Sequence, residues 1–286
     1  MPDPLTLLVD NGSLEPAATL GLRGLAATLA ARLGQPVAPV SLLHSSGIDP
    51  NNLGGEPAEI LFPSLERRLA AGQSDFVLLP LFFGPSRALT EYLPENLARL
   101  RQKFPALRLK IAPPLHAAGD DRLAQILADH VLDAGARLVR ALPGVDEPRP
   151  YSNADTPRVV VVDHGSPVEA VTAVRNELAC QVAGLLGSRV ALVSPASMER
   201  REGAEYDFCK PLLADLLAAP PWSAGRVIVA MQFLLPGRHA GPDGDVAKIC
   251  RAAEAAHPGL KTRMTKLVAE HPLLLDILAD RWRAVR

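Results

Sequence analysis

The sequence predicts an α/β protein made of two tandem copies of one domain, each with a parallel sheet covered by helices on both faces. Two observations support this prediction: an internal repeat, and an alternation of short apolar runs with amphipathic helical patterns inside each copy. The chain has 286 residues, of which 48% are hydrophobic. That is enough material for two separate cores.

The repeat is visible at the start of each copy. Residues 5–13 read LTLLVDNGS and residues 159–166 read VVVVDHGS. Three further blocks match in the same order and at nearly the same offset: 76–83 with 227–234, 104–107 with 257–260, and 123–129 with 274–280. Such regular spacing indicates a duplication. It predicts an amino-terminal domain over 1–142, a linker over 143–157 that is rich in Pro, Gly, Ser, Asn and Asp, and a carboxyl-terminal domain over 158–286.

The order of elements within a copy predicts the type of sheet. We expect strands near 5–9, 37–43, 76–83 and 108–112, each followed by a helix, and the second copy repeats this order. A βαβα order is typical of parallel sheets with helices on both faces, here of the flavodoxin-like kind. In such domains ligands bind at the carboxyl ends of the strands. The loops after the first and third strand of each copy are therefore the places to look for a site.

Composition excludes several classes of partner. Thirty basic and 31 acidic side chains nearly cancel, so nucleic acid and anionic membranes are not expected partners. No apolar run is long enough to span a membrane, and the first residues lack the basic region of a secretory signal, so we expect a cytoplasmic protein. The cysteines are three in number and far apart, which indicates neither a disulfide framework nor a thiolate metal site.

Two histidines of the second copy lie where the fold predicts a site. His164 follows the first strand, at a turn that Gly165 permits, and His239 lies in the Gly- and Pro-rich loop 233–245 after the third strand. We expect the two side chains to face one crevice. Two imidazoles without thiolates suit divalent ions such as Co²⁺, Fe²⁺, Ni²⁺ or Zn²⁺ and leave coordination positions open. The alternative is that both are ordinary polar residues of a duplicated fold.

The first copy has different residues at these two positions. Asn11 stands opposite His164, and Ala88 stands opposite His239. An amide and a methyl group cannot replace two imidazoles as ligands or proton acceptors. The sequence therefore predicts that only the second copy is catalytic.

Three motifs resemble the class II chelatases, which include sirohydrochlorin cobaltochelatases and ferrochelatases. They are His164-Gly-Ser, Phe-Leu-Leu-Pro-Gly-Arg-His239 and Glu270-His-Pro-Leu-Leu-Leu. The resemblance covers nearly the whole chain. It implies two chelatase-like domains, a tetrapyrrole in the cleft between them, both histidines near the metal as ligands and catalytic groups, and no organic cofactor.

The resemblance also implies roles for residues around the histidines. Glu199 is the expected third catalytic residue, although the length of its loop leaves Glu202 open as the alternative. Five further residues are expected to bind the substrate: Ser166 and Gly237 from the motifs, and Arg238, Arg200 and Arg201, whose guanidinium groups suit its carboxylates. For each arginine a surface salt bridge is the competing interpretation.

The function that follows is insertion of Co²⁺ or Fe²⁺, with Ni²⁺ also allowed, into sirohydrochlorin or a related tetrapyrrole, in cobalamin or siroheme biosynthesis. The metal is then a substrate. A non-catalytic carrier of tetrapyrrole or metal is the alternative. A serine hydrolase using Ser166 is disfavoured, because the sequence has no Gly-x-Ser-x-Gly elbow. The sequence leaves open which metal is physiological and whether the protein is a monomer or a homodimer.

Overall fold

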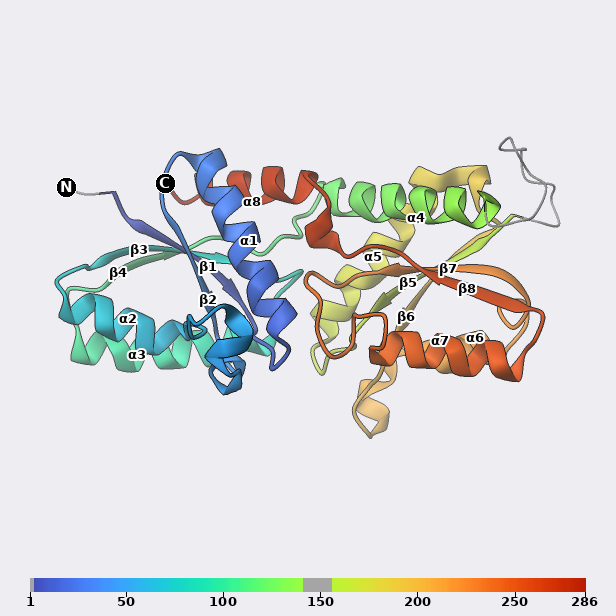
Figure 1. The fold of residues 1–286 in the computed structure, drawn as a ribbon, viewed down its shortest axis with the longest axis horizontal. Helices are drawn as coiled ribbons and strands as arrows, with labels where there is room; N and C mark the ends of the chain where they lie inside the picture. The colour runs from blue at the N-terminus through green and yellow to red at the C-terminus, as the bar shows by residue number, and fades with distance from the viewer. Residues whose placement is uncertain (1–2, 141–155) are drawn as a thin grey trace. The chain divides into compact units, whose positions relative to one another are not determined.

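The computed structural model describes residues 3–140 and 156–286 (Figure 1). The first sheet is parallel, with strand order β2-β1-β3-β4. Its strands are β1 (Leu5–Asp10), β2 (Val37–Ser41), β3 (Asp75–Pro80) and β4 (Arg108–Ile111). The strands predicted from the sequence are therefore present, within a few residues at their ends.

The second sheet repeats the first. Its strand order is β6-β5-β7-β8, again parallel. Its strands are β5 (Arg158–Asp163), β6 (Leu192–Ser197), β7 (Gly225–Met231) and β8 (Leu260–Met264). The same order in both sheets confirms the predicted fold class and the internal duplication.

Helices connect the strands and cover the sheets. In the first copy they are α1 (Pro16–Leu33), α2 (Leu61–Ala70), α3 (Leu93–Lys103) and α4 (Arg122–Arg140), and in the second α5 (Glu169–Leu186), α6 (Leu213–Ala218), α7 (Asp245–Ala256) and α8 (Leu273–Arg283). Helix α1 begins with a proline and ends at Gly34, which has a φ of 67°, as is common at helix termini. Among the helices of the described part, none is both long and apolar enough to cross a membrane.

The chain divides into two compact units that are not the two sequence copies. One unit is Met1–Ala118 with Leu234–Arg238 and Pro272–Arg286, and the other is Gly119–Phe233 with His239–His271. Helix α4 thus packs against α5 and β7, and α8 packs against α1 and β3. The domain boundaries expected from the sequence, 1–142 and 158–286, describe the two copies of the repeat and stay a prediction. Of the predicted linker 143–157, residues 143–155 lie outside the described residues.

The exchanged helix α8 is bonded to the first unit through its last turns. The indole Nε1 of Trp282 donates to the Thr6 hydroxyl of β1 at 2.9 Å. Arg281 donates to the carbonyls of Pro114 and Leu115 at 3.1 and 2.8 Å. These bonds tie α8 to the strand it covers and to the loop after β4.

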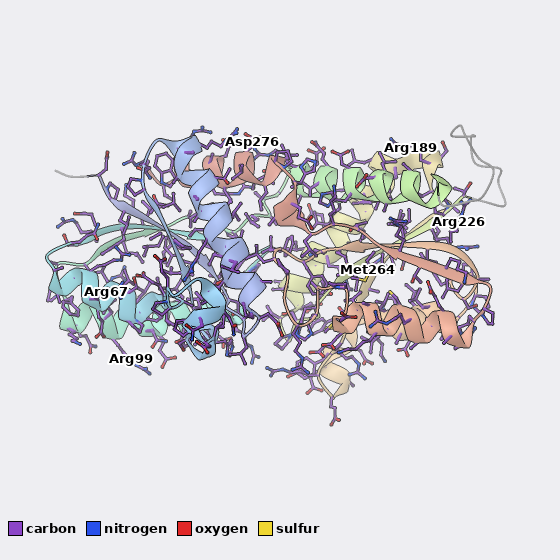
Figure 2. All side chains as sticks on the ribbon, in the orientation of Figure 1. Arg67, Arg99, Arg189, Arg226, Met264 and Asp276 are labelled. Atoms are coloured by element: carbon purple, nitrogen blue, oxygen red, sulfur yellow. The ribbon has the colours of Figure 1, made fainter. Side chains whose placement is uncertain are left out.

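Each unit has its own apolar core on the faces of its sheet. The central strands are almost fully apolar, as both of their faces are covered: Leu7, Leu8 and Val9 in β1, and Val159 to Val162 in β5, are buried. Charged side chains lie on the outer faces of helices. Arg67 on α2 and Arg99 on α3, for example, are exposed and pair with Glu59 and Glu95 (Figure 2). The carboxyl ends of β5 and β7 carry the loops described next.

Candidate functional site

The turn after β5 brings His164 beside Glu199. Gly165 has a φ of 94°, and a Cβ at this position would overlap the carbonyl oxygen of Glu199, so only glycine fits. The amide of Met198 donates to the carbonyl of Asp163 at 2.8 Å, and the amide of Glu199 donates to that of His164 at 3.2 Å. These two bonds tie the turn to the loop after β6. As a result, Nε2 of His164 lies 3.5 Å from Oε1 of Glu199.

His239 reaches the same place from the loop after β7. Its ring centroid lies 4.6 Å from that of His164, with an interplanar angle of 71°. The two imidazoles therefore lie beside each other at the ends of neighbouring strands, as expected from the sequence. The side chain of His164 is 48% exposed and that of His239 is 28% exposed. A ligand can reach both imidazoles from solvent.

Hydrogen bonds set the tautomer of both rings. Nδ1 of His164 lies 2.9 Å from the carbonyl oxygen of Gly165, and Nδ1 of His239 lies 2.7 Å from Oδ2 of Asp245. A carbonyl and a carboxylate only accept hydrogen bonds, so each Nδ1 carries the hydrogen. In the neutral rings the lone pair is then on Nε2, the nitrogen that is available to a metal ion or a proton.

Asp245 is a site residue that the sequence prediction missed. Hydrogen bonds from Lys248 and then from His239 lower the pKa of its carboxyl below the ordinary range, so it stays ionised near neutral pH. It lies at the amino terminus of α7, six residues after His239, where a helix stabilises a negative charge. Its position at the start of a helix, directly after the loop that carries a candidate ligand, could have identified Asp245 from the sequence.

The structure distributes the other predicted residues differently. Glu199 contacts His164, which favours it over Glu202. The Ser166 hydroxyl accepts a hydrogen bond from the Val168 amide at 3.1 Å, so it helps to shape the turn. Within residues 3–140 and 156–286, no three or more His, Cys, Asp or Glu side chains are grouped so that they could hold a metal ion. The histidine pair and the nearby Glu199 do not form such a group as they lie in the structure.

The predicted arginines and Gly237 have different surroundings in the structure. Arg200 donates to the carbonyls of Arg201 and Gly203 at 2.9 and 2.8 Å and lies 3.6 Å from Asp207, so it braces its own loop. Arg201 is exposed. Gly237 and Arg238 belong to the segment Leu234–Arg238, which packs within the first compact unit. Their role in binding substrate stays a prediction from the motif.

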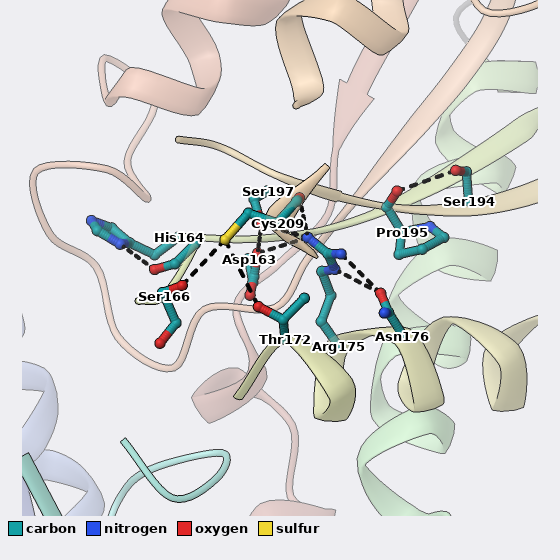
Figure 3. A network of polar contacts seen from close by, with 11 residues as sticks. Asp163, His164, Ser166, Thr172, Arg175, Asn176, Ser194, Pro195, Ser197 and Cys209 are labelled. Atoms are coloured by element: carbon teal, nitrogen blue, oxygen red, sulfur yellow. Dashed lines mark hydrogen bonds and ion pairs between the residues drawn. The ribbon is translucent and has the colours of Figure 1, made fainter. Parts of the chain in front are cut away.

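A buried polar network lies directly beneath the His164 turn (Figure 3). The Ser197 hydroxyl donates to Oδ1 of Asp163 at 2.7 Å, and Nη1 of Arg175 lies 3.6 Å from the same oxygen. Burial raises the pKa of the Asp163 carboxyl, and burial lowers the pKa of the Arg175 guanidinium, while the attraction between the two opposite charges acts against both changes. Each group thus offsets part of the cost of burying the other.

A family model covers the segment that contains this site. Residues 158–285 match the CbiX family, and this stretch includes His164, Glu199 and His239. The match therefore concerns the second copy of the repeat, which is the copy that carries the histidine pair. A search of curated proteins found no significant match.

Solved chelatase structures share the fold along nearly the whole chain. SirB from Bacillus subtilis, solved with Fe³⁺, has 15% sequence identity and a TM-score of 0.66, with 99% of this chain and 95% of SirB covered. The sirohydrochlorin chelatase SirB from Bacillus subtilis subspecies spizizenii, in complex with cobalt, has 16% identity and a TM-score of 0.67, with 99% and 94% covered. At these identities the likeness concerns the fold alone, and it includes both copies of the repeat.

A third structure has the same fold within a longer protein. DR2241 from Deinococcus radiodurans has 16% identity and a TM-score of 0.61, and this chain covers 55% of it. DR2241 is described as a multi-domain protein similar to chelatases, with two additional domains. The shared part corresponds to 99% of the present chain.

Proposed function

We propose that this protein is a class II chelatase that inserts a divalent metal ion, Co²⁺ or Fe²⁺, into sirohydrochlorin or a closely related tetrapyrrole. The observation that carries the proposal is the pairing of His164 and His239 at the carboxyl ends of β5 and β7, each with Nδ1 bonded to an acceptor. SirB proteins of the same fold have been solved with cobalt and with Fe³⁺. Ni²⁺ is also allowed by a pair of imidazole ligands.

The distance between His164 and Glu199 supports a metal-binding role for the site. Two ligand atoms held at about 2.1 Å from one ion at tetrahedral angles lie about 3.4 Å apart. The 3.5 Å between Nε2 of His164 and Oε1 of Glu199 is close to this separation. With only two or three protein ligands, the ion keeps positions open for water and then for pyrrole nitrogens.

Insertion also requires the loss of two protons from the pyrrole nitrogens. In this proposal His164 and His239 hold the ion through Nε2, and Glu199, 59% exposed, either completes the metal site or accepts protons as they leave the macrocycle. Asp245 keeps His239 in the orientation that presents Nε2. Arg201, which is exposed on the loop after β6, is the proposed contact for a substrate carboxylate, and Ser166, Gly237, Arg238 and Arg200 are the remaining proposed contacts.

The wider setting follows from the same proposal. The reaction serves cobalamin or siroheme biosynthesis, needs no organic cofactor, and runs in a monomer or homodimer. Cys180, Cys209 and Cys250 are all free thiols, which fits the reducing cytoplasm.

The test is a metal-insertion assay. Purified protein is mixed with a molar excess of sirohydrochlorin and Co²⁺ without oxygen, and the change in the tetrapyrrole absorption spectrum is followed over several turnovers. His164→Ala and His239→Ala should each lower the rate at least about a hundredfold, as expected when a ligand or proton acceptor is lost. His257→Ala is the matched control. His257 lies between the end of α7 and the start of β8, at the amino-terminal ends of the strands, whereas the candidate site lies at their carboxyl ends.

Each outcome of this assay has a defined meaning. Multiple turnovers that depend on both histidines support the chelatase assignment. Binding of tetrapyrrole and Co²⁺ with no turnover would identify a carrier of the same fold. Near-normal turnover in both histidine variants would remove the site assignment.

A further inference from the structure

Arg175 is a fully buried arginine on α5. Its guanidinium donates to Oδ1 of Asn176 at 2.8 Å, to the carbonyl of Cys209 at 2.9 Å and to the Ser197 hydroxyl, and it lies 3.6 Å from the Asp163 carboxylate. Taking a guanidinium out of water is costly, and apolar residues of similar volume usually give equal or greater stability at such places. Stability alone therefore does not account for an arginine here.

The first copy has no histidine in this turn, and it shows which residue then stands at the position of Arg175. Helices α1 and α5 have the same length, and the position of Arg175 in α5 is taken by Leu22 in α1, which is also buried. The aspartate and the turn glycine are kept, as Asp10 and Gly12. The histidine position is Asn11. The arginine and the histidine thus occur together in one copy and are both replaced in the other.

The groups that Arg175 contacts all lie next to site residues. Asp163 directly precedes His164, and its carboxylate accepts a hydrogen bond from the Gly165 amide. Ser197 ends β6, two residues before Glu199. The Cys209 thiol donates to the carbonyl of Ser166 at 3.2 Å. One side chain therefore connects the turn that carries His164, the strand end that leads to Glu199, and the end of the short 3-10 helix Ala204–Cys209 (Figure 3).

We propose that Arg175 is a positioning residue for metal binding: it holds Asp163, Ser197 and Cys209 in place, and so fixes His164 and Glu199 in the geometry that receives the ion. This inference rests on the proposed function. Arg175 does not touch the metal or the tetrapyrrole. Its effect is therefore expected on the affinity for the metal, whereas the affinity for the tetrapyrrole stays the same.

Arg175→Leu is the direct test, since leucine is the residue that the first copy uses. Co²⁺ binding is measured by calorimetry without tetrapyrrole, and KM for Co²⁺ and for sirohydrochlorin are measured in the insertion assay. We expect Kd and KM for Co²⁺ to rise about tenfold or more, the range seen when partners of metal ligands are removed, with an unchanged KM for sirohydrochlorin. Leu22→Ala is the control: it removes core packing at the matching position of the first copy and should lower the melting temperature without changing Kd for Co²⁺.

A second variant keeps the test valid if Arg175→Leu does not fold. Removing the arginine leaves the buried Asp163 carboxylate uncompensated, so the double variant Asp163→Asn with Arg175→Leu removes both charges. It should fold and still bind Co²⁺ about tenfold more weakly. A folded variant with wild-type Kd for Co²⁺ overturns the inference. Wild-type protein that binds Co²⁺ but inserts none overturns the proposed function and leaves the binding comparison intact, and wild-type protein that does not bind Co²⁺ overturns both.

Discussion

Asp10 is buried at the carboxyl end of β1, and its burial has a measurable effect on stability. Burial raises the pKa of its carboxyl from an ordinary value of 3.8 to about 6, although hydrogen bonds from the Ser41 hydroxyl and the Gly12 amide act in the opposite direction. Among the described residues, Oδ1 of Asp10 has no hydrogen-bond partner. We predict that Asp10→Asn makes the first unit more stable relative to wild type as the pH rises.

The sign and size follow from proton linkage. Between pH 4 and 6 the folded protein keeps a proton on Asp10 that the unfolded chain has already lost, so the free energy of unfolding falls as the pH rises through this window. A difference of about two pKa values at about 1.4 kcal/mol each gives a loss of about 3 kcal/mol, complete above pH 6. The introduced amide does not titrate. Any cost of its buried N–H is the same at every pH and does not alter the trend.

The assay is urea unfolding of wild type and Asp10→Asn between pH 4 and 7. Trp282 reports on the first unit because its indole donates to Thr6 on β1, and Trp222→Phe in both proteins removes the other tryptophan. Asp75→Asn is the control without this trend: the hydrogen bond from Arg108 lowers the pKa of Asp75, so its titration lies below the assay range and the difference from wild type should stay nearly flat from pH 4 to 7. If the difference between Asp10→Asn and wild type is flat from pH 4 to 7, the buried carboxyl is not held protonated and the reasoning fails.

Three further predictions concern the site. Asp245→Asn should lower kcat/KM for Co²⁺ insertion about tenfold to a hundredfold, because His239 loses the carboxylate that orients it; Asp243→Asn, at a 95% exposed side chain nearby, should not. Raising Co²⁺ from limiting to saturating should move the acid limb of the rate profile to lower pH, since the cation and protons compete for the same nitrogens; an unmoved limb would make His164 and His239 substrate-positioning residues. Asn11→Ala should change the insertion rate less than about threefold, against the loss of about a hundredfold or more expected for His164→Ala; a large loss would show that catalysis was assigned to the wrong copy.

The fold and the histidine pair could be predicted because their signals are local. Buried parallel strands are short apolar runs, and the repeat shows the same order of elements twice. The fold then places loops after the first and third strands at one edge of the sheet. That rule alone was enough to bring His164 and His239 together, and their rings lie 4.6 Å apart in the structure.

The exchange of the last helices could not be predicted in this way. Helices α4 and α8 are amphipathic, and such a pattern tells which face of a helix is buried but not which sheet it covers. The contacts that decide the matter are far apart in the sequence. Trp282 bonds to Thr6, 276 residues away, and Arg281 bonds to Pro114, 167 residues away.

The role of Arg175 could not be predicted from the sequence for a related reason. An arginine within a helix reads as a solvent-exposed residue, because arginine is almost never fully buried without a partner. Its partners Ser197 and Cys209 lie 22 and 34 residues further along the chain, on β6 and after it. Only the folded sheet brings these groups beneath the His164 turn.

Comparing the two copies distinguishes the residues that the turn needs in order to fold from the residues that occur only in the second copy. Both copies keep the aspartate and the glycine: Gly12 and Gly165 have φ values of 88° and 94°, and a Cβ on either would overlap the carbonyl oxygen of the residue opposite, Leu43 or Glu199. These residues are required by the backbone in any copy. His164, His239 and Arg175 are replaced in the first copy by Asn11, Ala88 and Leu22, and its sheet has the same strand order. Since the fold forms without these three side chains, folding does not require them, and the proposed metal insertion gives each of them a role.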